Sequence, residues 1–189
     1  MLDLVIRGGD VVTPQGVSRL DIAVEGETIA AVAQPGALNG VTAARTIDAT
    51  GRIVMPGGID PHVHMAHPWI LPGGKILTTK GPDHVGMSAL YGGTTTLIDF
   101  VYWSADKTAR QAIEEREKQF AGVAACDYAY HLMVHTDPPH DHMGQLAEAI
   151  QAGHPTVKIF TTNILPTRQG RMIDFGDIWE IFKVLAKEG

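Results

Sequence analysis

The sequence has little cysteine, no basic cluster and no long apolar run, and each lack excludes a class of protein. Cys126 is the only cysteine among 189 residues, which excludes an intrachain disulfide and a cysteine-based zinc site. The net charge is −6, so binding to a nucleic-acid backbone is not expected. No apolar run reaches the roughly 18 residues of a membrane span, and the N-terminus lacks the features of a signal peptide. We therefore expect a cytoplasmic protein with no nucleic-acid or membrane partner.

Hydrophobic residues make up 44% of the chain, which is ordinary for a globular protein that buries a core. Short alternating apolar runs fill residues 1–55 and indicate strands, with a tight hairpin turn at 25–27. From residue 56 onward, apolar runs of four to eight residues alternate with helical segments. The pattern predicts two domains, an all-β one over 1–55 and one of strand–helix units over 56–189.

Three segments of the second part have a helical pattern, at about 107–122, at about 143–153 and at 174–189. In the last of them apolar residues recur at i, i+3, i+4 and i+7, namely Ile178, Ile181, Phe182 and Leu185. Glu114 and Lys118 have the i, i+4 spacing of a helical ion pair. The spacing predicts amphipathic helices that cover a sheet.

Four apolar runs separate these helices and are predicted to be buried parallel strands: IVMPGGID, TTTLIDFV, YAYHLMV and TVKIF. Their ends recur at roughly 30 residues, the size of a strand with its crossover helix. Such α/β units suit the N-terminal half of a (β/α)8 barrel, and an open doubly wound sheet would give the same alternation. The chain has no nucleotide-type glycine fingerprint, which favours the barrel.

His62 and His64 follow the first predicted strand. Side chains at i and i+2 of a strand point to the same face, and in a barrel that face is the interior near the catalytic mouth. Two imidazoles there make half of a metal site. The alternative is one histidine satisfied in the core and one in a loop, and the position after Pro-Gly-Gly-Ile-Asp favours the metal.

Lys158 lies in the run TVKIF, which reads as a fully buried strand. Burial favours the neutral amine over the ammonium, and a neutral amine attacks carbon dioxide. The resulting carbamate is an anionic ligand with two oxygens that can bridge two divalent cations. The alternative is a lysine that extends from a strand end to solvent. The two upstream histidines favour the metal-bound form.

Four stretches resemble the cyclic-amidohydrolase branch of the amidohydrolase superfamily, most closely dihydropyrimidinases and hydantoinases: IDATGRIVMPGGIDPHVHM, SALYGGTTTLIDFV, CDYAYHLMV and TVKIF. The resemblance covers essentially the whole chain. It implies a small β-sandwich domain, of which residues 1–55 would supply some strands, and a TIM barrel, of which 56–189 would supply the first four units. It also implies two divalent metal ions, usually zinc, bridged by a carboxylated lysine and a hydroxide.

Carried over to this sequence, the resemblance makes His62 and His64 metal ligands and Lys158 the carboxylated bridge. Trp69 and Phe160 fall where such enzymes line the substrate pocket with apolar residues. Asn163 stands where hydantoinases resemble one another in having a tyrosine that holds the substrate. An amide still donates a hydrogen bond, but it is shorter than the phenol and is not a proton donor of the same kind.

The resemblance also implies two further histidines and a general-base aspartate that this chain does not contain. We therefore expect a fragment of a longer, homo-oligomeric hydrolase that opens a cyclic amide or ureide to an N-carbamoyl amino acid. The alternatives are a non-catalytic dihydropyrimidinase-like scaffold and another amidohydrolase, such as an allantoinase or dihydroorotase.

The remaining histidines do not obviously replace the missing ligands. His67 and His84, in predicted loops over the barrel mouth, are the best local substitutes. His131 and His135 belong to the third predicted strand. Three others lie in polar turn sequence, where a solvated ring is expected: His140, His142 and His154.

Overall fold

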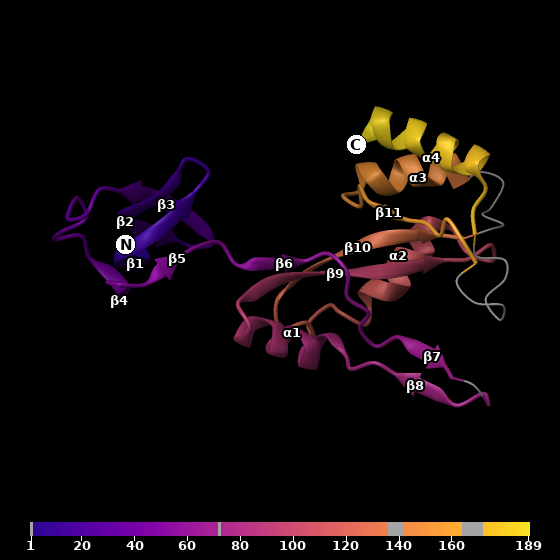
Figure 1. Ribbon diagram of the computed structural model, residues 1–189, viewed down its shortest axis with the longest axis horizontal. Coiled ribbons are helices and arrows are strands. Elements are labelled where there is room, and N and C mark those ends of the chain that lie inside the picture. The colour runs from indigo at the N-terminus through magenta and orange to yellow at the C-terminus, as the bar shows by residue number, and fades with distance from the viewer. Residues whose placement is uncertain (1, 72, 136–141, 164–171) are drawn as a thin grey trace. The chain divides into compact units, whose positions relative to one another are not determined.

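The computed structural model describes residues 2–71, 73–135, 142–163 and 172–189 (Figure 1). The chain divides into two compact units, Met1–Pro56 and Gly57–Gly189, and each is described by itself. No helix in the described part of the chain is long and apolar enough to cross a membrane.

The first unit is a mixed β-sheet. Its strand order is β3-β2-β1-β4, and β5 pairs with β1 as well. The hairpin neighbours β1 and β2, and β2 and β3, are antiparallel, whereas β4 and β5 run parallel to β1. The strands are β1 (Leu2–Thr13), β2 (Gly16–Glu25), β3 (Thr28–Ala33), β4 (Ala43–Asp48) and β5 (Ile53–Val54).

The turn between β2 and β3 confirms the predicted hairpin. Glu25 pairs with Thr28, which leaves Gly26 and Glu27 as a two-residue loop. Gly26 has φ +57°, a conformation that glycine adopts at little cost.

A buried carboxylate organises the loops of the first unit. Asp21 is 3% exposed and accepts hydrogen bonds from the backbone N–H groups of Gly8 (2.8 Å) and Gly36 (3.0 Å). Asp21 thereby joins β2 to a β1 bulge and to the segment after β3. Beside it, Val5 and Ala23 are almost completely buried and form part of the small core.

The second unit is built on a parallel sheet, which has four strands within the described residues, in the order β11-β10-β9-β6. The strands are β6 (Gly58–Asp60), β9 (Thr94–Trp103), β10 (Asp127–Val134) and β11 (Val157–Lys158). The helices are α1 (Pro82–Tyr91), α2 (Ala109–Glu117), α3 (His142–Gln151) and α4 (Phe175–Glu188). A short antiparallel hairpin, β7 (Pro68–Ile70) and β8 (Ile76–Thr78), follows β6.

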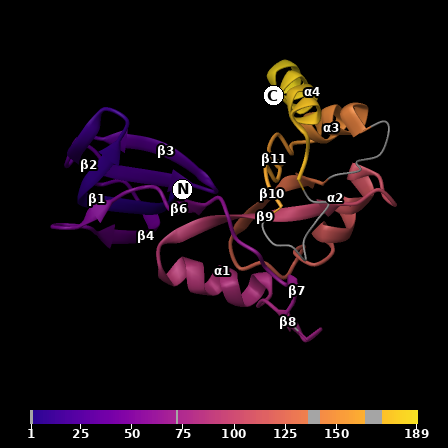
Figure 2. The same ribbon diagram turned by 45° about the vertical axis from the view of Figure 1, so that its right-hand side comes forward.

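One face of the parallel sheet packs against helices and forms the main core. Alternation along β9 puts Leu97, Val101 and Trp103 into a buried cluster with residues of α2, α3 and α4. Figures 1 and 2 show α3 and α4 side by side, and both α2 and α4 contribute buried residues to the same cluster. Ile98, Phe100 and Tyr102 alternate with the core residues and therefore point to the opposite face.

Local capping fixes where two of the helices begin. Thr108 and Gln111 form a reciprocal capping box at the start of α2. The Asp174 side chain accepts a hydrogen bond from the Asp177 backbone N–H (2.9 Å) at the start of α4. Phe182, predicted to belong to the apolar stripe of α4, is 53% exposed.

The structure differs from three other local predictions and contains elements that were not predicted. The run IVMPGGID is not one strand, because Pro56 has no N–H for a ladder; β5 before it joins the first sheet and β6 after it joins the second. The strand predicted over TVKIF is assigned only at β11, and its residues are half-buried rather than buried. Glu114 pairs with Arg110 (2.8 Å), not with Lys118 as predicted. Helix α1 and the β7–β8 hairpin were not predicted.

Candidate active site

His62 and His64 lie on the face of the parallel sheet that is opposite the helix-side core. They follow β6, and the backbone N–H of Val63 between them donates to the Ile98 carbonyl (3.2 Å), so pairing with β9 continues past the strand. Their ring centroids are 5.5 Å apart. Both rings also contact Phe100, at 4.7 Å for His62 and 4.5 Å for His64. The i, i+2 spacing thus places both imidazoles over one face.

Lys158 reaches the same face from β11. Its Nζ lies 5.8 Å from the centre of the Phe100 ring and 5.3 Å from that of Phe160. Phe100 is 2% exposed, and its ring forms an apolar floor that Lys158 shares with both histidines. The structure brings together the three residues that the sequence analysis assigned to metal binding, although Lys158 is half-buried rather than buried.

The environment of His64 keeps its ring neutral. Burial is the largest cause that lowers the pKa of His64 to about 4, and the neighbouring charges of His67, His62, Lys158 and Arg116 act in the same direction. Nδ1 of His64 is buried and has no hydrogen-bond partner within the described residues. A neutral imidazole with a nitrogen left unpaired has the chemistry of a metal ligand.

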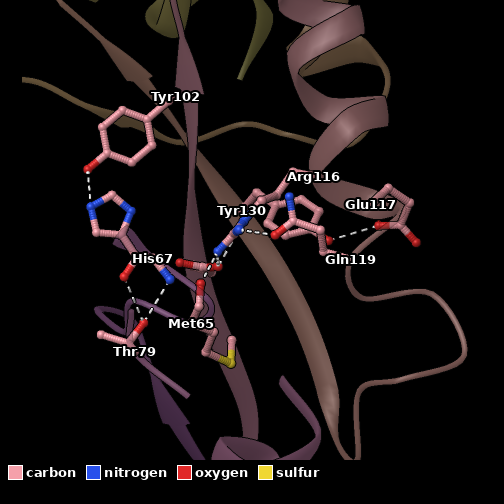
Figure 3. A network of polar contacts seen from close by, with 9 residues as sticks. Met65, His67, Thr79, Tyr102, Arg116, Glu117, Gln119 and Tyr130 are labelled. Atoms are coloured by element: carbon pink, nitrogen blue, oxygen red, sulfur yellow. Dashed lines mark hydrogen bonds and ion pairs between the residues drawn. The ribbon is translucent and has the colours of Figure 1, made fainter. Parts of the chain in front are cut away.

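His67 and Trp69 extend the site toward the β7–β8 hairpin. The His67 ring stacks on Tyr102 at 4.9 Å, and its Nε2 is 3.0 Å from the Tyr102 hydroxyl (Figure 3). The Thr79 hydroxyl accepts a hydrogen bond from the His67 backbone N–H (2.8 Å). Trp69 packs edge-on against both His64 (5.6 Å) and His67 (5.1 Å). Trp69 is thus an apolar wall beside the two histidines.

Phe160 and Asn163 lie beyond β11. Phe160 forms an isolated parallel bridge with Met172 and stacks at 6.0 Å on His135. Asn163 is exposed, and its Oδ1 accepts a hydrogen bond from the Met172 backbone N–H (3.3 Å). The structure therefore places Phe160 beside Lys158 and uses the Asn163 side chain to hold the backbone.

Both ring nitrogens of His131 form hydrogen bonds with neighbouring segments of the chain. One nitrogen bonds to the Thr156 hydroxyl (2.7 Å) and the other to the Pro61 carbonyl (2.8 Å). His131 therefore links β10 to the segments that carry His62 and Lys158.

Three predictions for the other histidines are wrong. His84 is exposed on α1 rather than in a loop. His142 is buried at the first turn of α3, and His154 is half-buried with its ring 6.1 Å from that of Tyr130. Burial also lowers the pKa of His154. His140 lies outside the described residues, and within those residues no three His, Cys, Asp or Glu side chains are placed to hold a metal ion together.

The sequence analysis did not identify Asp99 and Arg116, which form an ion pair behind His64. Asp99 is 1% exposed and comes from β9, and Arg116 comes from α2. The signal was in the sequence. Arg116 stands four residues after Ala112 and four before Phe120, both buried, so the helical period turns it toward the sheet.

The comparisons agree on one group of proteins. No family model matches the chain. The chain is 32% identical over 191 aligned residues to a D-hydantoinase of Rhizobium radiobacter, covering 100% of this chain and 38% of that protein. A D-hydantoinase of Ralstonia pickettii is 33% identical over 162 residues, covering 84% of this chain and 33% of that protein.

Solved structures give the same result. A D-hydantoinase structure matches 100% of this chain and 38% of its own length, with a TM-score of 0.81 and 30% identity. The dihydropyrimidinase of Brevibacillus agri matches with a TM-score of 0.82 and 29% identity over the same shares. The fold is therefore a mixed α/β fold of the hydantoinase type.

More particularly, the chain is a homologue of the D-hydantoinases and dihydropyrimidinases over its whole length. It spans only 38% of the length of the first of these relatives.

Proposed function

We propose that this chain is the N-terminal part of a metal-dependent hydrolase of cyclic amides. In this proposal residues 1–55 contribute strands to a β-sandwich, and residues 56–189 form the first four strand–helix units of a TIM barrel. The parallel sheet supports this because its strands lie side by side in chain order, as they do around a barrel. The observation that carries the proposal is the meeting of His62, His64 and Lys158 over Phe100, in a chain homologous to D-hydantoinases.

The residues present fit part of a metal site. His64 has a buried, unpaired ring nitrogen and a neutral ring, and His62 is exposed beside it on the same face. Lys158 would join them as a carbamate: its amine forms an N–C bond with carbon dioxide and releases a proton. These three side chains would hold two divalent ions, in this proposal zinc. When bound, such ions polarise the amide carbonyl and strengthen water as a nucleophile.

The other residues of the site would bind the ring of the cyclic amide substrate. Trp69 and Phe160 provide apolar walls, and Asn163 would offer an amide to the substrate if its bond to Met172 opens. The names of the relatives point to a hydantoin or a dihydropyrimidine. Water adds to the ring carbonyl carbon and the ring C–N bond breaks: the carbon becomes the carboxylate, the nitrogen takes a proton, and the single product is an N-carbamoyl amino acid.

The rest of the catalytic apparatus is assigned by the resemblance to residues that these 189 do not contain. We therefore expect the chain alone to bind metal without turnover, and the whole protein, a cytoplasmic homo-oligomer, to be the active hydrolase. The alternative is a non-catalytic dihydropyrimidinase-like scaffold, against which the presence of His62, His64 and Lys158 together argues. Metal binding separates the two proposals.

The test combines metal titration with carbamate detection. The chain is titrated with Zn²⁺ by calorimetry in bicarbonate buffer, and ¹³C NMR follows labelled bicarbonate. We expect binding that is lost in His62→Ala and His64→Ala, and a zinc-dependent carbamate signal that is absent in Lys158→Ala. Lys183→Ala, which removes an exposed lysine of α4, is the matched control. Zinc binding that is unchanged in all three site variants would refute the proposed site.

A further inference from the structure

Arg116 carries a charge that lies mostly out of solvent, and every side of its guanidinium is occupied. The side chain is 12% exposed, and its Nε donates to Asp99 Oδ2 at 3.1 Å. Nη2 bonds to the same carboxylate oxygen and to the backbone carbonyl of Met65. Nη1 donates to Gln119 Oε1 (2.7 Å), and the guanidinium lies 4.9 Å from the centre of the Phe120 ring.

This arrangement ties helix α2 to the backbone beside a candidate ligand. Figure 3 shows Arg116 pointing away from α2 toward Met65. Met65 is 1% exposed and directly follows His64. An exposed ion pair would contribute little to holding a backbone, but a desolvated guanidinium with fixed partners is held firmly.

The backbone beyond Met65 needs such a restraint. Ala66 has φ +45°, a left-handed conformation that an alanine adopts only where the surroundings impose it. The Ala66 N–H donates to the Lys80 carbonyl (2.7 Å) on one side of the turn, and Arg116 holds the Met65 carbonyl on the other. The chain therefore turns sharply at Ala66, two residues after His64, and two contacts fix the turn.

We propose that Arg116, fixed by Asp99, is a positioning residue that sets the orientation of the His64 ring through the Met65 carbonyl. The metal part of this inference rests on the proposed function, whereas the orientation of His64 does not. Partners that orient a ligand from behind affect metal affinity strongly, typically by 10- to 100-fold. Arg116 is not itself a candidate ligand: it holds the backbone of Met65, the residue after the ligand, and its charge also helps to lower the pKa of His64.

The experiment compares Arg116→Lys with Arg110→Lys. Both change an arginine of α2, but Arg110 is exposed and forms its ion pair with Glu114 on the same helix. The His64 ring stacks on Phe100 at 4.5 Å, so its proton chemical shifts contain the Phe100 ring current and report its orientation without any metal. The shifts are measured by NMR on the folded chain, and zinc affinity is measured by competition with a chelating dye.

We expect Arg116→Lys to shift the His64 ring protons and to weaken zinc binding about 10- to 100-fold, with Arg110→Lys unchanged in both. Asp99→Asn removes the charged partner of Arg116 and leaves Arg116 in place. It should change the chemical shifts of the His64 ring protons in the same direction, and it replaces Arg116→Lys in the test if that variant does not fold. Lower thermal stability with unchanged His64 shifts in the folded variants would overturn the inference. If the unmutated chain binds no zinc, the proposed function fails, and the His64 shifts alone decide the positioning role.

Discussion

Replacing Phe100 by alanine should destabilise the second unit and disorder the candidate site together. Phe100 is 2% exposed, and its ring contacts the rings of His62, His64 and His131 and lies under the Lys158 amine. Removal of a buried phenylalanine ring costs about 3–5 kcal/mol through lost transfer free energy and the cavity that remains. That is a large share of the roughly 5–15 kcal/mol of a typical domain. Both histidine rings also pack on the Phe100 ring, so we expect its loss to change their orientation.

Urea unfolding followed by circular dichroism measures the first effect, and the His64 proton shifts measure the second. Phe100→Leu keeps an apolar side chain and should cost only about 1 kcal/mol while still moving the His64 shifts. Leu146→Ala is the control, because Leu146 is fully buried on α3 in the helix-side core and should cost about 2–5 kcal/mol with no change at His64. A Phe100→Ala variant with native stability or native His64 shifts would show that Phe100 is not the floor of the site.

Two other predictions concern pH and the first unit. Because burial lowers the pKa of His64 to about 4 and also lowers that of His154, the unfolded chain binds more protons than the folded one at acid pH. The free energy of unfolding should therefore be highest above about pH 6.5 and fall toward pH 4. Urea unfolding midpoints measured across this range should vary less with pH in His64→Gln and His154→Gln. An unchanged dependence of the midpoint on pH in these variants would show that the two histidines do not cause it. Asp21→Ala should cost about 1–3 kcal/mol, because it leaves the N–H groups of Gly8 and Gly36 without their acceptor. Thermal melting of the β-sheet signal tests this, and a variant that melts like the unmutated chain would disprove it.

The sequence predicted best where a single local pattern decides the structure. The runs TTTLIDFV and YAYHLMV are rich in apolar and β-branched residues, and they form β9 and β10, whose later residues are mostly buried. The face shared by His62 and His64 follows from their spacing alone. Their role as ligands remains a prediction that the zinc titration tests.

The misses depend on partners that are distant in the sequence. Pro56 breaks the apolar run IVMPGGID, and the two halves join different sheets because β5 pairs with β1 and β6 with β9, partners that the run does not specify. Lys158 was predicted to be buried and is half-buried. Its burial depends on what packs beside β11, which the run TVKIF does not specify. The Asp99–Arg116 pair joins residues 17 apart on different elements, and a pattern of apolar residues does not encode which charges meet.

The position of Trp69 gives the site its own optical signal. Its indole lies 5.6 Å from the His64 ring, close enough for a paramagnetic ion such as Co²⁺ on that imidazole to quench its emission. Trp103 is buried in the helix-side core and Trp179 is 63% exposed on α4, so each would add a background that differs in wavelength. Occupancy of the imidazoles could therefore be followed in a fluorimeter, without a dye or a substrate.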